Sequence, residues 1–134
     1  MEQNGWATGK FLVDGFPRNE DNYTGWNEVM GDSITLAGVL HFIVEEEALI
    51  QRVMLRSQSS GRSDDNIDTL RNRLSQYKTE QLPIIERYTG MGLVKTINGD
   101  QDIDTVYNTV KEALTGYIWS IILTNSIEKY FVKT

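Results

Sequence analysis

Short apolar runs, each ending in glycine or acidic residues, mark the strand candidates along this chain. The two clearest are Phe11–Val13 before Asp14-Gly15 and Val39–Val44 before three glutamates, and the more mixed segment Leu93–Ile97 before Asn98-Gly99 is a third candidate. Continuous apolar runs of this kind are typical of strands that are buried on both faces of a sheet. The pattern therefore predicts a sheet that contains these three strands.

Helical periodicity lies between and after these runs. Apolar residues recur every three or four positions in Ala48–Arg56, Ile67–Glu80 and Ile103–Leu114, and the Ser/Gly-rich stretch Ser57–Ser63 is the clearest loop. Strands that alternate with helices are typical of an α/β domain, in which helices flank a parallel sheet. This is the fold class that we expect.

Composition narrows the class of protein. The chain has 134 residues, of which 40% are hydrophobic, with 13 Lys+Arg, 19 Asp+Glu and no Cys, which predicts one globular domain without disulfides. The net charge of −6 argues against binding to nucleic acid or to an anionic membrane. The most apolar stretch, Tyr117–Leu123, is far shorter than the roughly 20 residues of a membrane span, and the N-terminus has no basic, apolar leader. We therefore expect a cytoplasmic protein, with the nucleus as a second location.

The turn after the first predicted strand carries the first candidate chemistry. In a parallel sheet, ligands bind beyond the carboxyl ends of the strands, and Asp14 would stand at that edge, where it could orient Mg²⁺ near a polyphosphate. Pro17 would fix Arg18 just past the strand, and an arginine suits phosphate because its planar fork donates two parallel hydrogen bonds. The alternative is that Asp14-Gly15 is an ordinary turn.

Four arginines flank the Ser/Gly loop, two on the helix before it, one directly after it and one on the next helix: Arg52, Arg56, Arg62 and Arg73. The first two are four residues apart and therefore share one helix face. Four cations around one loop could form an anion site. The alternative is that they are surface charges paired with Glu45–Glu47 and Asp64-Asp65, and the two aspartates are also suited to cap the following helix.

Two longer motifs carry a family resemblance. The segment Phe11–Asn22, which reads FLVDGFPRNEDN and is followed by Gly25-Trp26, resembles the nucleoside monophosphate kinases, and within them the UMP/CMP kinases. Ser60–Asn66, which reads SGRSDDN, is similar to the lid segment of that family. The resemblance runs from about Lys10 to Leu114. It implies transfer of the γ-phosphoryl group of ATP, bound with Mg²⁺, to CMP or UMP.

The resemblance also implies roles for residues on the acceptor side. By motif match, Asp14 resembles the carboxylate that positions Mg²⁺ through water, Gly15 and Arg18 resemble residues at the acceptor phosphate, and Asn22 resembles the amide that reads the pyrimidine ring.

The lid and the ATP side are matched in the same way. Arg56, Arg62 and Arg73 resemble the lid arginines that close over the transferring phosphates, and they are the catalytic candidates together with Asp14. Of these, Arg62 and Arg73 would also reach the acceptor nucleotide, and Arg56 would reach ATP. Arg52 resembles the arginine that lies against the adenine, and Asn98 and Gly99 fall where the family's backbone borders the adenine pocket.

The sequence departs from this family in two places. No G-x-x-x-x-G-K-[ST] phosphate loop occurs in the 134 residues, so the amides and lysine that would cradle the ATP phosphates are missing, with their strand and helix. Residues 115–134 do not follow the family pattern. We therefore expect a partial, N-terminally truncated P-loop NTPase (adenylate kinase-like) domain over residues 1–114, with a lid at about 57–66 and an extension at 115–134.

These departures shape the expected activity. We expect a monomer that binds ATP and CMP or UMP but, alone, transfers no appreciable phosphate; the alternative is an inactive nucleotide-binding or partner-binding module. The first strand would lose neighbours, leaving apolar surface to be exposed or covered by another segment. For Tyr117–Leu123, extra packing or an incorrectly read gene end is favoured over an interaction segment. The single histidine, His41, is expected to be structural rather than a metal ligand.

Overall fold

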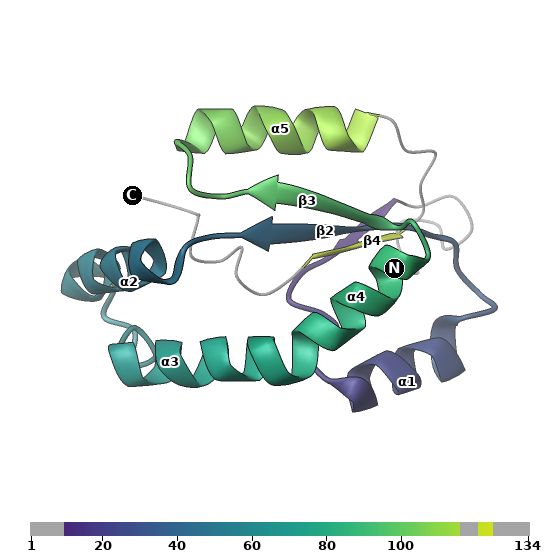
Figure 1. The fold of residues 1–134 in the computed structure, drawn as a ribbon, viewed down its shortest axis with the longest axis horizontal. Helices are drawn as coiled ribbons and strands as arrows, with labels where there is room; N and C mark the ends of the chain where they lie inside the picture. Colours follow the sequence, from purple (N-terminus) through teal and green to yellow (C-terminus); the bar gives the residue numbers. More distant parts are fainter. Residues whose placement is uncertain (1–9, 116–120, 125–134) are drawn as a thin grey trace.

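The computed structural model of the protein describes residues 10–115 and 121–124, which form strands and helices in alternation (Figure 1). In chain order these are β1 (Phe11–Val13), α1 (Glu20–Met30), β2 (Leu36–Ile43), α2 (Glu46–Ser60), α3 (Ile67–Gln76), a π-helical turn η2 (Tyr77–Gln81), α4 (Leu82–Gly90), β3 (Val94–Asn98), α5 (Ile103–Thr115) and β4 (Ile121–Thr124).

The four strands form one parallel sheet in the order β1-β4-β2-β3. All three strands predicted from apolar runs are present, and the predicted α/β class with helices flanking a parallel sheet is confirmed. β2 begins earlier than expected, at Leu36. Since β2 is an interior strand, its segment from Gly38 to Phe42 is buried.

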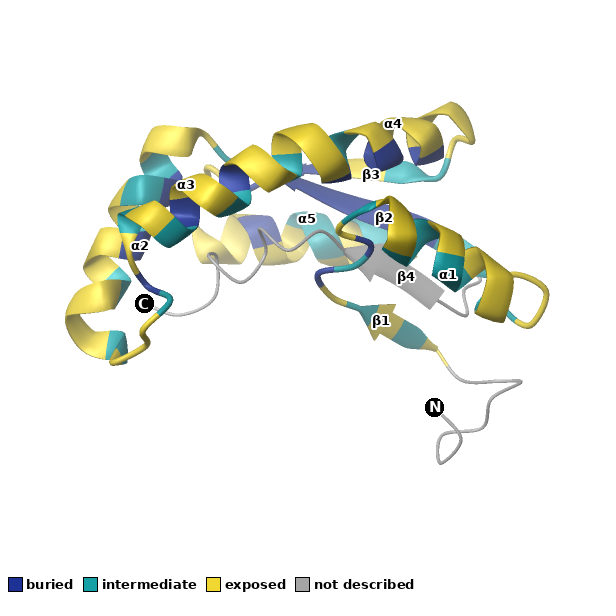
Figure 2. Cartoon of the chain, turned by 90° about the horizontal axis from the view of Figure 1, so that it is seen from below, coloured by how far each residue is buried: buried dark blue, intermediate teal, exposed yellow. Residues whose placement is uncertain are grey.

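Helices cover both faces of the sheet. Figure 1 shows α5 along one face and α1 and α4 along the other, with α2 and α3 extending past the carboxyl end of β2. Three buried clusters hold these layers together, one on each face of the sheet and one between α2 and α3: Val39, Ile84 and Tyr88; Leu40, Phe42, Ile97 and Val106; and Leu49, Val53, Leu70 and Leu74. Figure 2 shows the buried positions gathered on the inward sides of α3 and α4.

The expected loop Ser57–Ser63 was wrong in its first half, because α2 continues through Ser60. The hydroxyls of Ser57 and Ser59 donate to helix carbonyls three residues earlier, so these serines fit a helical end. The helix then stops at Gly61, whose φ of 61° suits a glycine at the end of a helix. Four of the ten residues assigned to the lid, 57–60, are therefore helical.

The cap of α3 also differs from the expectation. Asn66, rather than Asp64 or Asp65, is the N-cap, and its side chain accepts a hydrogen bond from the Thr69 amide at 2.8 Å. The two aspartates face the arginines of the lid instead.

Two helices, α1 and α4, were not predicted. α1 has no fully buried residue, so the sequence shows no marked apolar stripe that would predict it. Asn19 caps the start of this helix. It is fixed to α4 by a two-pronged ion pair, in which both Nη atoms of Arg87 lie within 2.9 Å of the Glu20 carboxylate. α4 continues directly from α3 through η2, so the two helices and the π-helical turn form one bent rod (Figure 1).

The structure describes only part of the C-terminal window Tyr117–Leu123, for which extra packing was expected. Ile121–Thr124 forms β4 inside the sheet, which agrees with extra packing, whereas residues 117–120 of the predicted apolar window lie outside the described part. Residues 1–9 also lie outside it. Within the described ranges, no helix is both long and apolar enough to cross a membrane.

Candidate functional site

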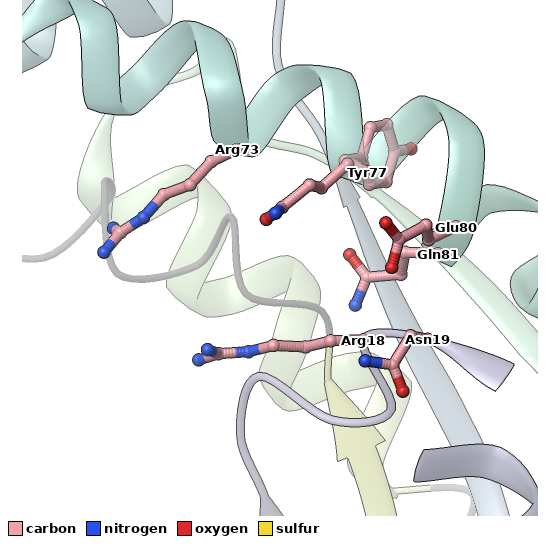
Figure 3. Close-up of a pocket in the computed structure, with 7 residues that line it drawn as sticks. Arg18, Asn19, Arg73, Tyr77, Glu80 and Gln81 are labelled. Carbon is pink, nitrogen blue, oxygen red and sulfur yellow. The ribbon is translucent and has the colours of Figure 1, made fainter. Parts of the chain in front are cut away.

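A pocket lies between the loop that follows β1 and the rod formed by α3 and η2 (Figure 3). Its volume is about 160 Å³. It is lined by Arg18, Asn19, Arg73, Gln76, Tyr77, Glu80 and Gln81. Figure 3 shows Arg18 and Arg73 extending in the same direction from opposite walls of the pocket. Two arginines from distant segments therefore line one pocket.

Gln81 holds the loop against the rod. Its side chain is buried, with 3% of the residue exposed, and its Nε2 donates a 2.7 Å hydrogen bond to the carbonyl of Pro17. The Phe16–Pro17 peptide bond is cis. A buried amide of this kind is costly to leave without a partner, so the bond fixes the backbone next to Arg18.

Arg18 itself is oriented by local hydrogen bonds. Its Nε donates to the carbonyl of Gly15 at 2.9 Å, and its backbone amide donates to Oδ1 of Asn22 at 3.1 Å. The backbone amide of Asn22 in turn donates to Oδ1 of Asn19, the N-cap residue of α1. The terminal Nη atoms of Arg18 remain as the donors that face the pocket side (Figure 3).

Tyr77 connects the pocket to the centre of the sheet. Its hydroxyl lies 2.6 Å from Nε2 of His41, which is only 6% exposed in β2. Burial lowers the pKa of His41 and raises the pKa of Tyr77, so both side chains are neutral at pH 7. The expected structural role of His41 agrees with this contact.

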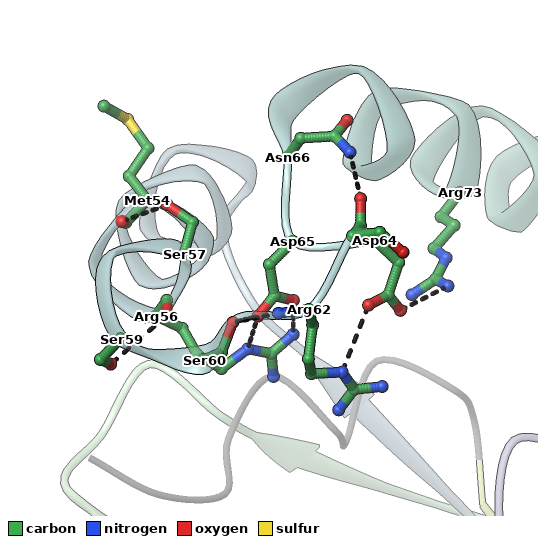
Figure 4. Close-up of polar contacts among 11 residues, drawn as sticks. Met54, Arg56, Ser57, Ser59, Ser60, Arg62, Asp64, Asp65, Asn66 and Arg73 are labelled. Atoms are coloured by element: carbon green, nitrogen blue, oxygen red, sulfur yellow. Dashed lines mark hydrogen bonds and ion pairs between the residues drawn. The ribbon is translucent and has the colours of Figure 1, made fainter.

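An ion pair closes the end of α2 against the following loop (Figure 4). Arg56 binds the Asp65 carboxylate through Nε and Nη2, and the Ser60 hydroxyl donates to the same carboxylate at 2.6 Å. The hydrogen bonds from Arg56 lower the pKa of Asp65 to about 2 and outweigh its burial. With 1% of its side chain exposed, Asp65 is charged and fully paired.

Asp64 joins the other two lid arginines. One carboxylate oxygen lies 3.2 Å from Nε of Arg62, and the other lies 3.2 Å from Nη2 of Arg73 (Figure 4). Burial would raise the pKa of Asp64, but the charges of Arg62 and Arg73 lower it. The alternative that acidic residues pair with these arginines is thus correct for Asp64 and Asp65, whereas Glu46 pairs with Lys78 at 3.1 Å.

A second group of candidates meets where β2 and β3 end. Nη2 of Arg52 donates to the carbonyl of Gly99 at 2.9 Å, and the Gly99 amide donates to the carbonyl of Ile43 at 2.8 Å. The Asn98 side chain accepts from the backbone amide of Asp100. Arg52, Asn98 and Gly99 therefore lie together at this end of the sheet.

The predicted site residues fall into three sets. Arg18 and Arg73 share the pocket, three lid arginines share two neighbouring aspartates, and Arg52 lies with Asn98 and Gly99. Asp14 is exposed on the turn after β1, beside the buried Gly15. Asn22 contacts the backbone of Arg18 but does not line the pocket.

Sequence reasoning missed several pocket residues: Asn19, Gln76, Tyr77, Glu80 and Gln81. Tyr77 lies within the predicted helix Ile67–Glu80, and nothing in the periodicity of that helix indicates a π-helical turn that would face Glu80 and Gln81 toward the loop after β1. The feature that marks this site is a buried polar side chain, Gln81. Its burial is known only from the fold, so no pattern in the sequence could have shown it.

The protein is therefore of the α/β class, with arginines gathered near the carboxyl edge of a parallel sheet, the edge at which ligands bind in such folds. The family model for adenylate kinase matches residues 1–93. The chain belongs to the adenylate kinase family.

Similar proteins narrow the resemblance within that family. The chain is 45% identical to UMP-CMP kinase of Homo sapiens over 101 residues, which are 75% of this chain and 52% of that protein. It is 42% identical to the UMP-CMP kinases of Xenopus tropicalis and Danio rerio, over 77% and 78% of this chain and 53% and 54% of those proteins. The resemblance to UMP/CMP kinases is confirmed, and the chain spans about half the length of the relatives it matches.

The Arg56–Asp65 pair predicts a specific acid sensitivity. Because the pKa of Asp65 in the folded protein is about 2, below its ordinary 3.8, its charge stabilises the fold above about pH 4 and this stabilisation is lost as the pH falls toward 2. Asp65→Asn should lower the free energy of unfolding by on the order of 2 kcal/mol at pH 6, and by much less at pH 2.5. Urea denaturation at both pH values measures the difference. A loss that is equal at the two pH values would contradict the assignment, and Asp64→Asn, at a more exposed site, is the matched control.

Proposed function

We propose that these residues form the acceptor-binding and lid part of a pyrimidine nucleoside monophosphate kinase, which transfers the γ-phosphoryl group of ATP to CMP or UMP. The observation that carries this proposal is the pocket between Arg18 and Arg73, to which two arginines from distant segments contribute. The relatives named UMP-CMP kinase support the choice of a pyrimidine nucleotide.

The pocket would hold the phosphate of the acceptor nucleotide. Arg18 and Arg73 offer charge-assisted hydrogen bonds, which are about twice as strong as neutral ones. The loop that carries Arg18 is fixed before a ligand arrives, because Gln81 binds the Pro17 carbonyl. A pre-organised phosphate site loses little entropy on binding and aligns the acceptor oxygen for in-line attack.

Asn22 would lie at the base end of the acceptor. Its Oδ1 already accepts a hydrogen bond from the Arg18 amide, so its Nδ2 is the group left to donate to a ring oxygen or nitrogen. Asn22 therefore has two roles in this proposal, since it orients Arg18 and contacts the pyrimidine.

The lid arginines would exchange carboxylate partners for phosphate. Asp64 bridges Arg62 and Arg73 at 3.2 Å in both contacts, which are partly exposed, and exposed ion pairs contribute little net stability. The transferring phosphates, which carry more charge than a carboxylate, can compete for these arginines. Arg56 would stay paired with the buried Asp65 and direct its remaining charge to ATP. Closure of the loop around Gly61 would then exclude water.

The donor nucleotide and its metal ion would lie along the same edge. Arg52, with Asn98 and Gly99, would border the adenine. Among the described residues, no three His, Asp or Glu side chains are close enough to hold a metal ion directly, which suits an ion held mainly by ATP phosphates and water. Asp14, exposed after β1, would orient those waters. Mg²⁺ supplies charge neutralisation at the β- and γ-phosphates when it is bound.

A second candidate function is the binding of a nucleotide or a partner without phosphoryl transfer. It is favoured by the absence of a G-x-x-x-x-G-K-[ST] loop from the 134 residues. Monomeric state, cytoplasmic location and division of the chain at residue 114 stay predictions.

We expect the full chain to bind CMP and UMP, and Arg18→Ala to weaken this binding by roughly 10- to 100-fold, the effect of losing one or two charged hydrogen bonds. Isothermal titration calorimetry measures the dissociation constants. Arg73→Ala should act similarly from the other wall of the pocket, whereas Arg71→Ala, on the same helix but outside the pocket, should change little. An equal response to Arg71→Ala and Arg73→Ala would contradict the assignment.

Asn22→Ala separates base reading from support of Arg18. If Asn22 contacts the pyrimidine as well as the Arg18 amide, the variant should weaken CMP binding by about 1–3 kcal/mol more than it weakens the binding of ribose 5-phosphate, which has no base. Calorimetry with both ligands measures this contrast. Equal losses for the two ligands would show that Asn22 acts only through the Arg18 amide.

With ATP, Mg²⁺ and CMP, we expect these 134 residues alone to produce no CDP above the uncatalysed background, because no phosphate loop positions the donor. A coupled assay for ADP and chromatography of the nucleotides measure turnover. Turnover at a rate typical of enzymes, of order 10 per second, would overturn this expectation and leave the acceptor site unaffected.

A further inference from the structure

The π-helical turn η2 places two consecutive side chains on the wall of the pocket. The turn is marked by the hydrogen bond from the Leu82 amide to the Tyr77 carbonyl, and both Glu80 and Gln81 line the pocket. Single π-helical turns inside α-helices are frequently found at functional sites. Gln81 holds the loop after β1 through its side-chain amide, so Glu80 is the member of this pair whose role is open.

The Glu80 carboxylate lies in the pocket without a protein partner. Other carboxylates of the described chain are paired with cations, among them Glu20, Glu46, Asp64 and Asp65. Within the described ranges, no hydrogen bond or ion pair engages the side chain of Glu80. An ionised carboxylate only accepts hydrogen bonds, whereas a guanidinium only donates them. Glu80 is therefore an unused acceptor in a pocket that two arginines line with donors.

The donors and this acceptor lie toward different ends of the pocket. Figure 3 shows the guanidinium groups of Arg18 and Arg73 reaching toward one end. Glu80 lies at the other end, beside Gln81 and on the side of Asn19 (Figure 3). Arg73 and Glu80 are separated along the rod by about 10 Å, at a rise of about 1.5 Å per helical residue. The pocket thus offers one ligand a cationic end and an acceptor end.

The acceptor end leads toward the residue proposed to contact the base. Asn19 caps α1, and the Asn22 backbone amide donates to its Oδ1 at 2.9 Å. Asn22 itself does not line the pocket. A nucleotide whose phosphate lies between the two arginines and whose base reaches Asn22 therefore passes Glu80 with the sugar that joins them.

Ribose carries the groups that a carboxylate accepts. Its 2′- and 3′-hydroxyls are neighbouring donors, and each of the two oxygens of a carboxylate can accept one of them. An acidic residue that binds a ribose hydroxyl also occurs in the dinucleotide-binding α/β folds. A 2′-deoxyribose would leave one of these two hydrogen bonds unmade.

We propose that Glu80 is a specificity-determining residue of the acceptor site, whose carboxylate accepts hydrogen bonds from the ribose hydroxyls and so selects ribonucleotides over 2′-deoxyribonucleotides. The inference rests on the proposed function, because Arg18 and Arg73 define where the phosphate lies. Glu80 acts on the ratio of the affinities for CMP and dCMP. These ligands share one base and one phosphate, so any general effect of the negative charge of Glu80 on phosphate binding cancels in the ratio.

Isothermal titration calorimetry of the full chain with CMP and dCMP tests this assignment. We expect CMP to bind roughly 5- to 20-fold more tightly than dCMP, the effect of one hydrogen bond to a charged acceptor at a site open to water. In Glu80→Ala the two dissociation constants should agree within about twofold, with the larger loss for CMP, because neither ligand then finds the carboxylate. Glu80 is exposed, so its truncation leaves the core untouched.

Glu86→Ala is the matched control, since Glu86 is an exposed carboxylate on α4 that does not line the pocket. This variant should keep the preference of the unchanged chain for CMP. The inference is overturned if the unchanged chain binds CMP and dCMP equally, if Glu80→Ala leaves the preference intact, or if both variants reduce it alike.

Two further outcomes are distinguished by the same titrations. If Glu80→Ala removes a preference for CMP over UMP instead, the carboxylate contacts the cytosine amino group and the ribose assignment is wrong. Failure of the proposed function has a separate signature, which is no binding of CMP at all, or binding that Arg18→Ala leaves unchanged. Binding that depends on Arg18 with a ribose preference that ignores Glu80 would overturn the role of Glu80 alone.

Discussion

The hydrogen bond from Gln81 to the Pro17 carbonyl is the contact on which the candidate site depends. It joins residues 64 positions apart and is buried, with a length of 2.7 Å. It holds the loop after β1 against the rod of α3, η2 and α4, and so places Arg18 across the pocket from Arg73. The π-helical turn places Gln81 where this bond can form, and the ion pair between Arg87 and Glu20 secures the same two layers further along α4.

The ion pairs near this contact differ in how far they are buried. Arg56 and Asp65 form a buried pair that keeps the end of α2 on the following loop, whereas Arg62 and Arg73 share a partly exposed Asp64. Breaking the first is costly, and breaking the second is cheap. In the proposed function, Arg62 and Arg73 would be released from Asp64 to a ligand, while Arg56 and Asp65 continue to hold the end of α2.

Much of the fold could be predicted from the sequence, because buried parallel strands give continuous apolar runs and α5 has a clear helical period. α1 could not, since none of its residues is fully buried, and the end of α2 was hidden by serines that bind their own helix carbonyls. β4 depends on pairing with strands more than 80 positions away. The arginines were predicted by motif match, but Gln81 and Tyr77 were not, because their importance comes from long-range contacts with Pro17 and His41.

The most direct test of the account is an NMR titration of the full chain with CMP. The pocket predicts that the largest amide shifts occur at residues of its two walls, among them Arg18, Asn19, Arg73 and Tyr77, and that all of them follow one dissociation constant. The Gln81 side-chain amide should remain protected throughout. Shifts centred elsewhere, such as the apolar groove of Tyr107, Val110 and Leu114 on α5, or no shifts at millimolar CMP, would contradict a nucleotide site built on the contact between Gln81 and Pro17.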